Sequence, residues 1–121
     1  MSRAIFAGDD VIHLYEMGDE DRSNYEGIPY NDDTSEGRYQ SYPQELKDEL
    51  WNRLIHGNNR MYSIYNEREE YCGYIELLKP NSSTPEIGIE IVKEHRNKGI
   101  AKRAVYLCYT EPRQLKRKHI T

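Results

Sequence analysis

One continuous stretch, residues 87–107, constrains the fold more than any other part of the chain. Isoleucines alternate over residues 87–91 and predict a strand; a basic turn follows, and a periodic apolar run then predicts a helix. The turn, residues 96–101, reads Arg-Asn-Lys-Gly-Ile-Ala. The first turn of a helix has backbone N–H groups without partners, and the helix dipole adds partial positive charge there. This order of elements therefore predicts a site for an anion such as a phosphate.

The side chains around this turn favour the same interpretation. Gly99 has no Cβ, so a ligand can approach its backbone closely. Positive charge comes from neighbouring basic side chains: Arg96, Lys98, Lys102 and Arg103. The alternative is an ordinary strand-to-helix turn with a solvated basic face. The strand–turn–helix setting favours the anion site, because phosphate-binding motifs require that setting.

Three strand-length runs are separated by short polar turns in the middle of the chain. The runs span residues 61–65, 71–78 and 86–92, and the turns span residues 66–70 and 79–85. Short turns of this kind favour an antiparallel meander.

The first part of the chain adds a strand and a long insertion. Residues 11–15 are predicted to form a strand, and the polar residues 18–42 a long loop with one helical turn at most. The helix after Gly99 must end by about residue 111, because Pro112 cannot sit in its interior. Together with a helix in the middle of the chain, these elements predict an α+β fold.

That middle helix is predicted to start near Ser41. Ser41 and Gln44 have capping-box spacing, and Pro43 fits the first turn, where its missing N–H costs little. Gly57 is predicted to end the helix in a left-handed conformation. The apolar residues recur at helical spacing and predict a stripe that faces the core: Leu46, Leu50, Trp51, Leu54 and Ile55.

Composition favours one small domain without metal or membrane contact. The chain has 121 residues, so a single domain over residues 1–121 is predicted. No apolar run approaches the roughly 20 residues that span a bilayer, and residues 1–10 lack the features of a signal peptide. Neither Cys72 and Cys108 nor the four histidines show metal-ligand spacing, so no metal site is predicted. We expect a cytoplasmic protein with reduced thiols.

Charge is distributed unevenly along the chain. The net charge is −4, yet residues 1–50 hold 13 acidic and four basic side chains, and residues 93–121 hold two acidic and nine basic ones. The basic end suits an anionic cofactor, and the acidic end suits a cationic acceptor. The alternative for the acidic half is charge that serves solubility alone. A nucleic-acid partner is not expected, because the basic cluster is small and the total charge is negative.

The pattern Arg-x-x-Gly-x-Ala at Arg96, Gly99 and Ala101 resembles the coenzyme A pyrophosphate loop of the GNAT N-acetyltransferases. Within that family, residues 86–101 look most like the branch that acetylates ribosomal-protein N-termini. The resemblance covers residues 11–110 in order of elements and is specific over residues 86–105. It implies an acetyl-CoA-dependent N-acetyltransferase that acts on a primary amine: a protein N-terminus, a lysine or a small amine.

The resemblance also implies roles for individual residues. Backbone N–H groups near Ile91 and Val92 would hold the pantetheine arm and face the thioester. The cofactor's pyrophosphate would be bound by the loop and the start of the helix: Arg96, Asn97, Lys98, Gly99, Ile100, Ala101 and Lys102. Glu86 and Glu90 are candidates for the base, because residues four apart on a strand share a face. The alternative is that both glutamates simply face solvent.

A complete GNAT domain continues beyond this helix with another strand, a helix and a final strand pair, whereas this sequence stops at Thr121. The resemblance therefore implies a domain shortened at its C-terminus. The strand at residues 86–92 would become a sheet edge, so we expect a homo-oligomer or a partner that completes the sheet. The alternative function is a truncated, non-catalytic binding or regulatory module that acts through protein–protein contacts.

Overall fold

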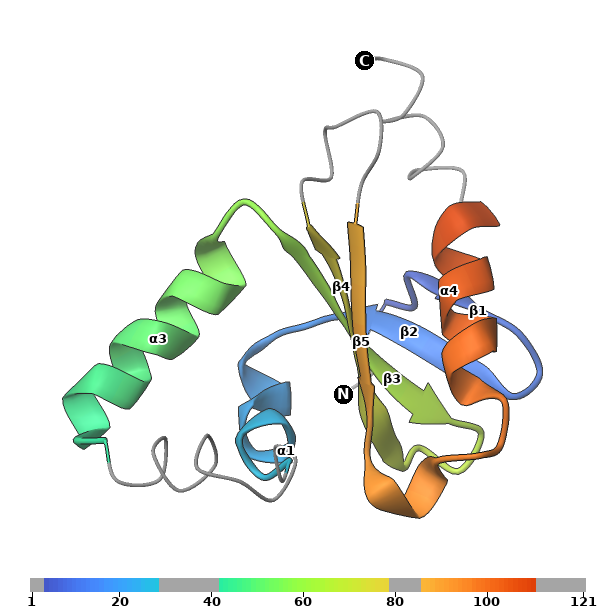
Figure 1. The fold of residues 1–121 in the computed structure, drawn as a ribbon, viewed down its shortest axis with the longest axis horizontal. Coiled ribbons are helices and arrows are strands. Elements are labelled where there is room, and N and C mark those ends of the chain that lie inside the picture. Colours follow the sequence, from blue (N-terminus) through green and yellow to red (C-terminus); the bar gives the residue numbers. More distant parts are fainter. Residues whose placement is uncertain (1–3, 29–41, 79–85, 111–121) are drawn as a thin grey trace.

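The computed structural model describes residues 4–28, 42–78 and 86–110, which form an antiparallel sheet with helices on both faces (Figure 1). The strand order is the order of the sequence, β1-β2-β3-β4-β5. The α+β fold class and the antiparallel meander are thereby confirmed. The strands have these bounds: β1 Ala7–Gly8, β2 Ile12–Glu16, β3 Arg60–Asn66, β4 Tyr71–Leu78 and β5 Glu86–Ile91.

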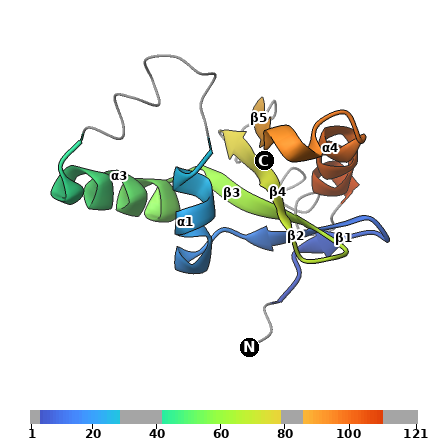
Figure 2. The same ribbon diagram turned by 90° about the horizontal axis from the view of Figure 1, so that it is seen from below.

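The helices cover the two faces of the sheet unequally. Figures 1 and 2 show α4 on one side of the sheet, and α1 and α3 on the other. Short 3-10 turns precede α1 and α4 in the sequence. The bounds are η1 Asp19–Asp21, α1 Arg22–Glu26, α3 Gln44–His56, η2 Lys93–His95 and α4 Ile100–Thr110. Among these helices, none is long and apolar enough to cross a membrane.

The larger core lies between α4 and the sheet. Ile100 and Ala104 of α4 are buried there against residues such as Leu14, Ile64 and Ile75 of the central strands. The isoleucines of β5 pack against the same core from its edge: Ile87, Ile89 and Ile91. Burial of apolar area on this scale is the main force that holds α4 in place.

A smaller core lies on the opposite face, under α1 and α3. Met17, Trp51 and Met61 form its buried centre, with Tyr25 and Tyr74 packed against them. Trp51 also donates its indole N–H to the carboxylate of Asp19, at 2.8 Å from Nε1 to Oδ1. A buried indole N–H needs such an acceptor, and this one joins α3 to η1.

A buried carboxylate fixes the start of α1 against the sheet. The Asp21 side chain is fully buried, and its Oδ1 accepts a hydrogen bond from the Tyr65 hydroxyl at 2.7 Å. Its Oδ2 accepts the backbone N–H of Gly18 at 3.0 Å. Because a buried charge is stable only when its oxygens have donors, these bonds explain why a charged residue is tolerated there.

Several details of the helix α3 differ from the sequence-based expectation. The helix begins after Pro43, which makes no side-chain cap, and Ser41 lies outside the described residues. Gly57 has φ −80° and ψ −174°, so the predicted left-handed stop is wrong and the chain leaves the helix in an extended conformation toward β3. The expected apolar stripe is narrower than predicted, because Trp51 is buried whereas Leu46 is 36% exposed.

The strand β5 lies at the edge of the described sheet. It pairs with β4, with Gly73 opposite Ile91 and Tyr74 opposite Glu90. Within residues 4–28, 42–78 and 86–110, no strand pairs with the other side of β5. The homo-oligomer or partner expected to complete this edge stays a prediction.

Candidate active site

The loop between β5 and α4 contains two residues in the left-handed region. Asn97 has φ 64° and Gly99 has φ 78°, one on each side of Lys98. Asparagine and glycine are the residue types that tolerate this conformation best. The loop therefore has the residues that its backbone requires, and it leads directly into the first turn of α4.

The N-terminus of α4 presents backbone donors to open space. The Arg103 N–H donates to the Gly99 carbonyl oxygen at 3.2 Å, which closes the first turn. The N–H groups of Ile100, Ala101 and Lys102 come before that bond and have no acceptor within α4. A Cβ placed on Gly99 would have no heavy atom of the described residues within 4 Å, apart from its neighbours in the chain, so the space over this glycine is open there. A diphosphate fits this arrangement of donors, space and partial charge.

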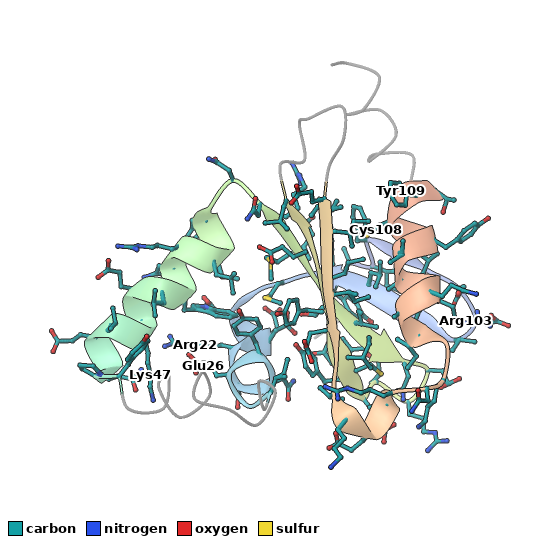
Figure 3. The ribbon with its side chains drawn as sticks, in the orientation of Figure 1. Arg22, Glu26, Lys47, Arg103, Cys108 and Tyr109 are labelled. Carbon is teal, nitrogen blue, oxygen red and sulfur yellow. The ribbon has the colours of Figure 1, made fainter. Side chains whose placement is uncertain are left out.

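The basic side chains around the loop are not equivalent. Lys98 and Lys102 are exposed and available to an anion. Arg103 points away from the sheet (Figure 3) and pairs with Asp9 in the turn between β1 and β2, at 2.9 Å from Nη1 to Oδ2. Burial alone raises the pKa of Asp9, but hydrogen bonds from the N–H groups of Ile12 and Val11 and from Arg103 outweigh it and lower that pKa overall.

The two residues expected to hold the pantetheine arm face different directions. The Val92 N–H donates to the Cys72 carbonyl at 2.9 Å, so this N–H belongs to the sheet. Backbone groups alternate in direction along a strand, so the N–H and C=O of Ile91 face the side of β5 that has no partner strand among the described residues, here called its open edge. The Ile91 carbonyl there accepts a hydrogen bond from Arg96 Nε at 2.8 Å. The open edge thus offers the N–H of Ile91 rather than that of Val92.

The two candidate bases lie on one face of β5, as their spacing predicts. Because Ile87, Ile89 and Ile91 pack toward α4, the alternate residues Glu86 and Glu90 point to the face that carries α1 and α3. Glu86 is exposed at the start of the strand. The side chain of Glu90 is 25% exposed and forms an ion pair with Arg96, at 3.0 Å from Nη2 to Oε2.

The aromatic ring of Tyr74 and the carboxylate of Glu76 adjoin Glu90 on this face. The ring of Tyr74, opposite Glu90, lies 5.2 Å from that of Tyr25, which lies 5.7 Å from Trp51. Burial raises the pKa of Tyr74, with further contributions from Tyr25, Glu90 and Glu76. Aromatic faces and carboxylates together attract cations. The sequence contains eleven tyrosines, but this composition alone does not indicate where the rings meet.

A small cavity opens beside this cluster, at the end of α3. Its volume is about 260 Å³, and Leu54, Asn59 and Glu76 are among its lining residues. Asn59 donates its side-chain N–H to Glu76 Oε2 at 3.1 Å, which orients that carboxylate. Glu76 is paired with Gly88, between Glu86 and Glu90 on the neighbouring strand.

The cysteines do not provide a nucleophile. Burial raises the pKa of Cys108 to about 12 and is the main cause that raises the pKa of Cys72 to about 11. Because the thiolate is the reactive form, both thiols are inert near neutral pH. Cys108 points from α4 toward the sheet, and the Tyr109 side chain lies near the C-terminal end of the helix (Figure 3). In the described residues, no cluster of His, Cys, Asp and Glu is arranged to hold a metal ion.

Solved structures with a similar fold are acetyltransferases. One is spermidine N-acetyltransferase from Vibrio cholerae in complex with CoA and spermine, with a TM-score of 0.60 and 20% identity over 78% of this chain. Another is spermidine/spermine N-acetyltransferase SpeG from Vibrio cholerae in complex with manganese ions, with a TM-score of 0.60 and 23% identity over 79% of this chain. The chain spans 59% and 57% of the lengths of these two proteins.

The sequence itself matches a family model. No curated protein matches the chain significantly. The model of the acetyltransferase (GNAT) domain matches residues 3–119, which is nearly the whole chain. The match includes β5, the loop around Gly99 and α4, where the geometry suits a diphosphate. The chain therefore belongs to the GNAT acetyltransferase family.

Proposed function

We propose that this protein is an acetyl-CoA-dependent N-acetyltransferase that transfers an acetyl group to a primary amine. The observation that carries the proposal is the open, left-handed loop at Gly99 in front of the first N–H groups of α4, which have no acceptor within that helix. Membership of the GNAT family supports it. The spermidine N-acetyltransferases of similar fold support an amine acceptor, and one of them was crystallised with CoA.

The donor side of the site would be made mostly of backbone. The N–H groups of Ile100, Ala101 and Lys102 would bind the diphosphate of the cofactor, with Lys98 and Arg96 contributing charge. The loop residues Asn97 and Gly99 would hold the backbone in the required shape. The Ile91 N–H would bind the pantetheine arm along the open side of β5, whereas the Val92 N–H is engaged by Cys72. Acetyl-CoA supplies the thioester whose acetyl group is transferred.

The acceptor side would be the face of β5 that carries Glu86 and Glu90. An amine must lose a proton before it attacks a thioester, so a carboxylate near the strand edge is needed as the base or to orient a water. Glu90 is the stronger candidate, because it is partly buried, lies opposite Tyr74 and stands next to the edge where the thioester would be held. Glu86 lies farther along the same strand and remains the second candidate.

The acceptor would be cationic before it reacts. The aromatic and acidic face around Tyr74 suits an ammonium group, and the acidic first half of the chain would attract it over longer range. Protein N-termini, lysine side chains and small polyamines all meet this requirement. The spermine in the similar Vibrio cholerae complex makes a polyamine the first acceptor to test.

Isothermal titration with acetyl-CoA tests the donor site. We expect the wild-type protein to bind, and Gly99→Glu to lose binding because it places a carboxylate where the diphosphate would lie. Thr110→Glu is the matched control: it adds the same charge at the other end of α4 and should bind as the wild type does. A wild-type protein that gives no heat, or a Gly99→Glu variant that binds equally well, would contradict the proposal.

Release of free CoA measures turnover. Acetyl-CoA is incubated with spermidine, a lysine peptide or peptides with free N-termini, and we expect at least one of these amines to accelerate thiol release. Acetylated amine is identified by mass spectrometry. Binding of acetyl-CoA without turnover on any amine would instead favour the non-catalytic module.

A further inference from the structure

The further inference concerns Arg96 and rests on the proposed function. Arg96 stands three residues before Gly99, yet its side chain turns back toward β5. Its Nε donates to the Ile91 carbonyl oxygen at 2.8 Å, and its Nη2 lies 3.0 Å from Glu90 Oε2. One guanidinium therefore joins the open edge of β5, where the pantetheine arm is proposed to lie, to the candidate base.

An anion can break the ion pair between Arg96 and Glu90. The side chain of Arg96 is 46% exposed and that of Glu90 is 25% exposed, so solvent screens their attraction. Exposed ion pairs contribute little to stability, because the screened attraction barely offsets the loss of side-chain freedom. A diphosphate at the N-terminus of α4 carries more negative charge than one carboxylate and presents several oxygens to the planar guanidinium fork.

We propose that Glu90 and the diphosphate of the cofactor share Arg96, which acts as a positioning residue between the two sides of the site. In the free protein Arg96 neutralises Glu90. When the donor binds, the guanidinium turns to the diphosphate and leaves the Glu90 carboxylate for the ammonium of the acceptor. Donor and cationic acceptor therefore strengthen each other's binding, and thermodynamic linkage makes the effect mutual.

Binding of CoA itself, measured without turnover, tests the sharing of Arg96. Glu90→Gln removes the competing carboxylate but keeps the size of the side chain, so we expect CoA to bind about two- to fivefold more tightly. Arg96→Met removes a charged hydrogen-bond donor, and we expect about tenfold weaker binding. Glu49→Gln is the matched control: it removes the same charge from another exposed glutamate–arginine pair, Glu49 with Arg53 on α3, and should leave the affinity unchanged.

The double variant Arg96→Met with Glu90→Gln distinguishes shared use of Arg96 from a direct repulsion between the Glu90 carboxylate and the diphosphate. In the Arg96→Met background, Glu90→Gln should no longer tighten CoA binding, because the residue through which it acts is gone. Unchanged affinity in Glu90→Gln, or the same tightening with and without Arg96, would overturn the inference while the proposed function stands. A wild-type protein that does not bind CoA would remove the proposed function, and this inference with it.

The dependence of the amine KM on the acetyl-CoA concentration is a kinetic measurement that a purely structural role of Arg96 would not change. In the wild type, KM for a cationic amine should fall as acetyl-CoA approaches saturation, and in Arg96→Met this dependence should disappear. Arg96→Lys keeps the charge but not the planar fork, so it should restore part of the CoA affinity. An amine KM that is independent of acetyl-CoA in the wild type would contradict the coupling. Thermal unfolding of each variant checks that the fold is intact.

Discussion

At the scale of single residues, the loop depends most on Gly99. Its φ of 78° is one that residues with a Cβ adopt at a cost, although the space around it is open. We therefore expect Gly99→Ala to lower the free energy of unfolding by about 1 kcal/mol through backbone strain alone. Urea denaturation measures this change. A loss several times larger would show that the space over Gly99 is filled in the folded protein.

The two cysteines give a second test at this scale. Burial holds the pKa of Cys108 at about 12, and burial is the largest of the causes that hold the pKa of Cys72 at about 11. Both side chains are buried and free of disulfides. We expect neither thiol to react with iodoacetamide in the native protein at pH 8, and both to react in guanidinium. Mass spectrometry counts the modified thiols, and rapid native modification of either one would contradict the packing described.

The hydrogen bonds that Asp9 accepts from the N–H groups of Ile12 and Val11 and from Arg103 predict a dependence of stability on pH. The pKa of Asp9 in the folded protein lies below its ordinary value of 3.8, so the folded state binds the proton less readily than the unfolded chain. The stabilisation from Asp9 is complete above pH 3.8 and is lost as the pH falls through the folded-state value. Asp9→Asn should therefore be less stable than wild type at pH 7, and the difference should shrink near pH 3. A difference that is equal at both pH values would contradict this account.

At the scale of elements, β4 approaches β5 closely at Gly73. Gly73 has φ 143° and is paired with Ile91, and a Cβ added to it would overlap the carbonyl oxygen of Glu90. We expect Gly73→Ala to cost about 2–4 kcal/mol, because both the backbone conformation and the strand spacing must change. Gly88→Ala is the control, since its Cβ would lie 3.8 Å from the nearest atom, Glu76 Oε1. Equal thermal unfolding of the two variants would contradict the close approach.

The elements with strong local signals could be predicted from the sequence. Residues 71–78 form β4 as predicted, and α4 begins just after Gly99 and ends before Pro112. The two-residue strand β1 was not predicted, because it is too short to have a periodicity. The prediction that Gly57 ends α3 in a left-handed conformation was wrong. The direction in which the chain leaves the helix toward β3 depends on tertiary packing and not on the glycine itself.

The site could be predicted only in part, for physical reasons. The loop around Gly99 follows from residues that are adjacent in the sequence. Which of Ile91 and Val92 presents its N–H to the open edge depends on the pairing register of β4 and β5, and Val92 is bonded to Cys72. The ion pair of Glu90 with Arg96 depends on how the chain folds back after β5. Neither feature has a sequence pattern.

At the scale of the whole molecule, the sheet separates the two parts of the proposed site. α4 and its N-terminal donors lie on one side, and the face with Glu90, Tyr74 and Trp51 lies on the other (Figures 1 and 2). They come together only at the open edge of β5, where Ile91 and Arg96 stand. An acetyl donor bound to the loop would therefore reach an amine on the opposite face by passing along this edge.

The central claim is that backbone N–H groups around Gly99 bind the diphosphate of CoA. A titration of ¹⁵N-labelled protein with CoA, followed by amide chemical shifts, tests it most directly. We expect the largest shifts at the amides of Gly99, Ile100 and Ala101, and small shifts in the interior of β2 and β3. Binding that leaves these loop amides unchanged, or an absence of any shift at saturating CoA, would contradict the account.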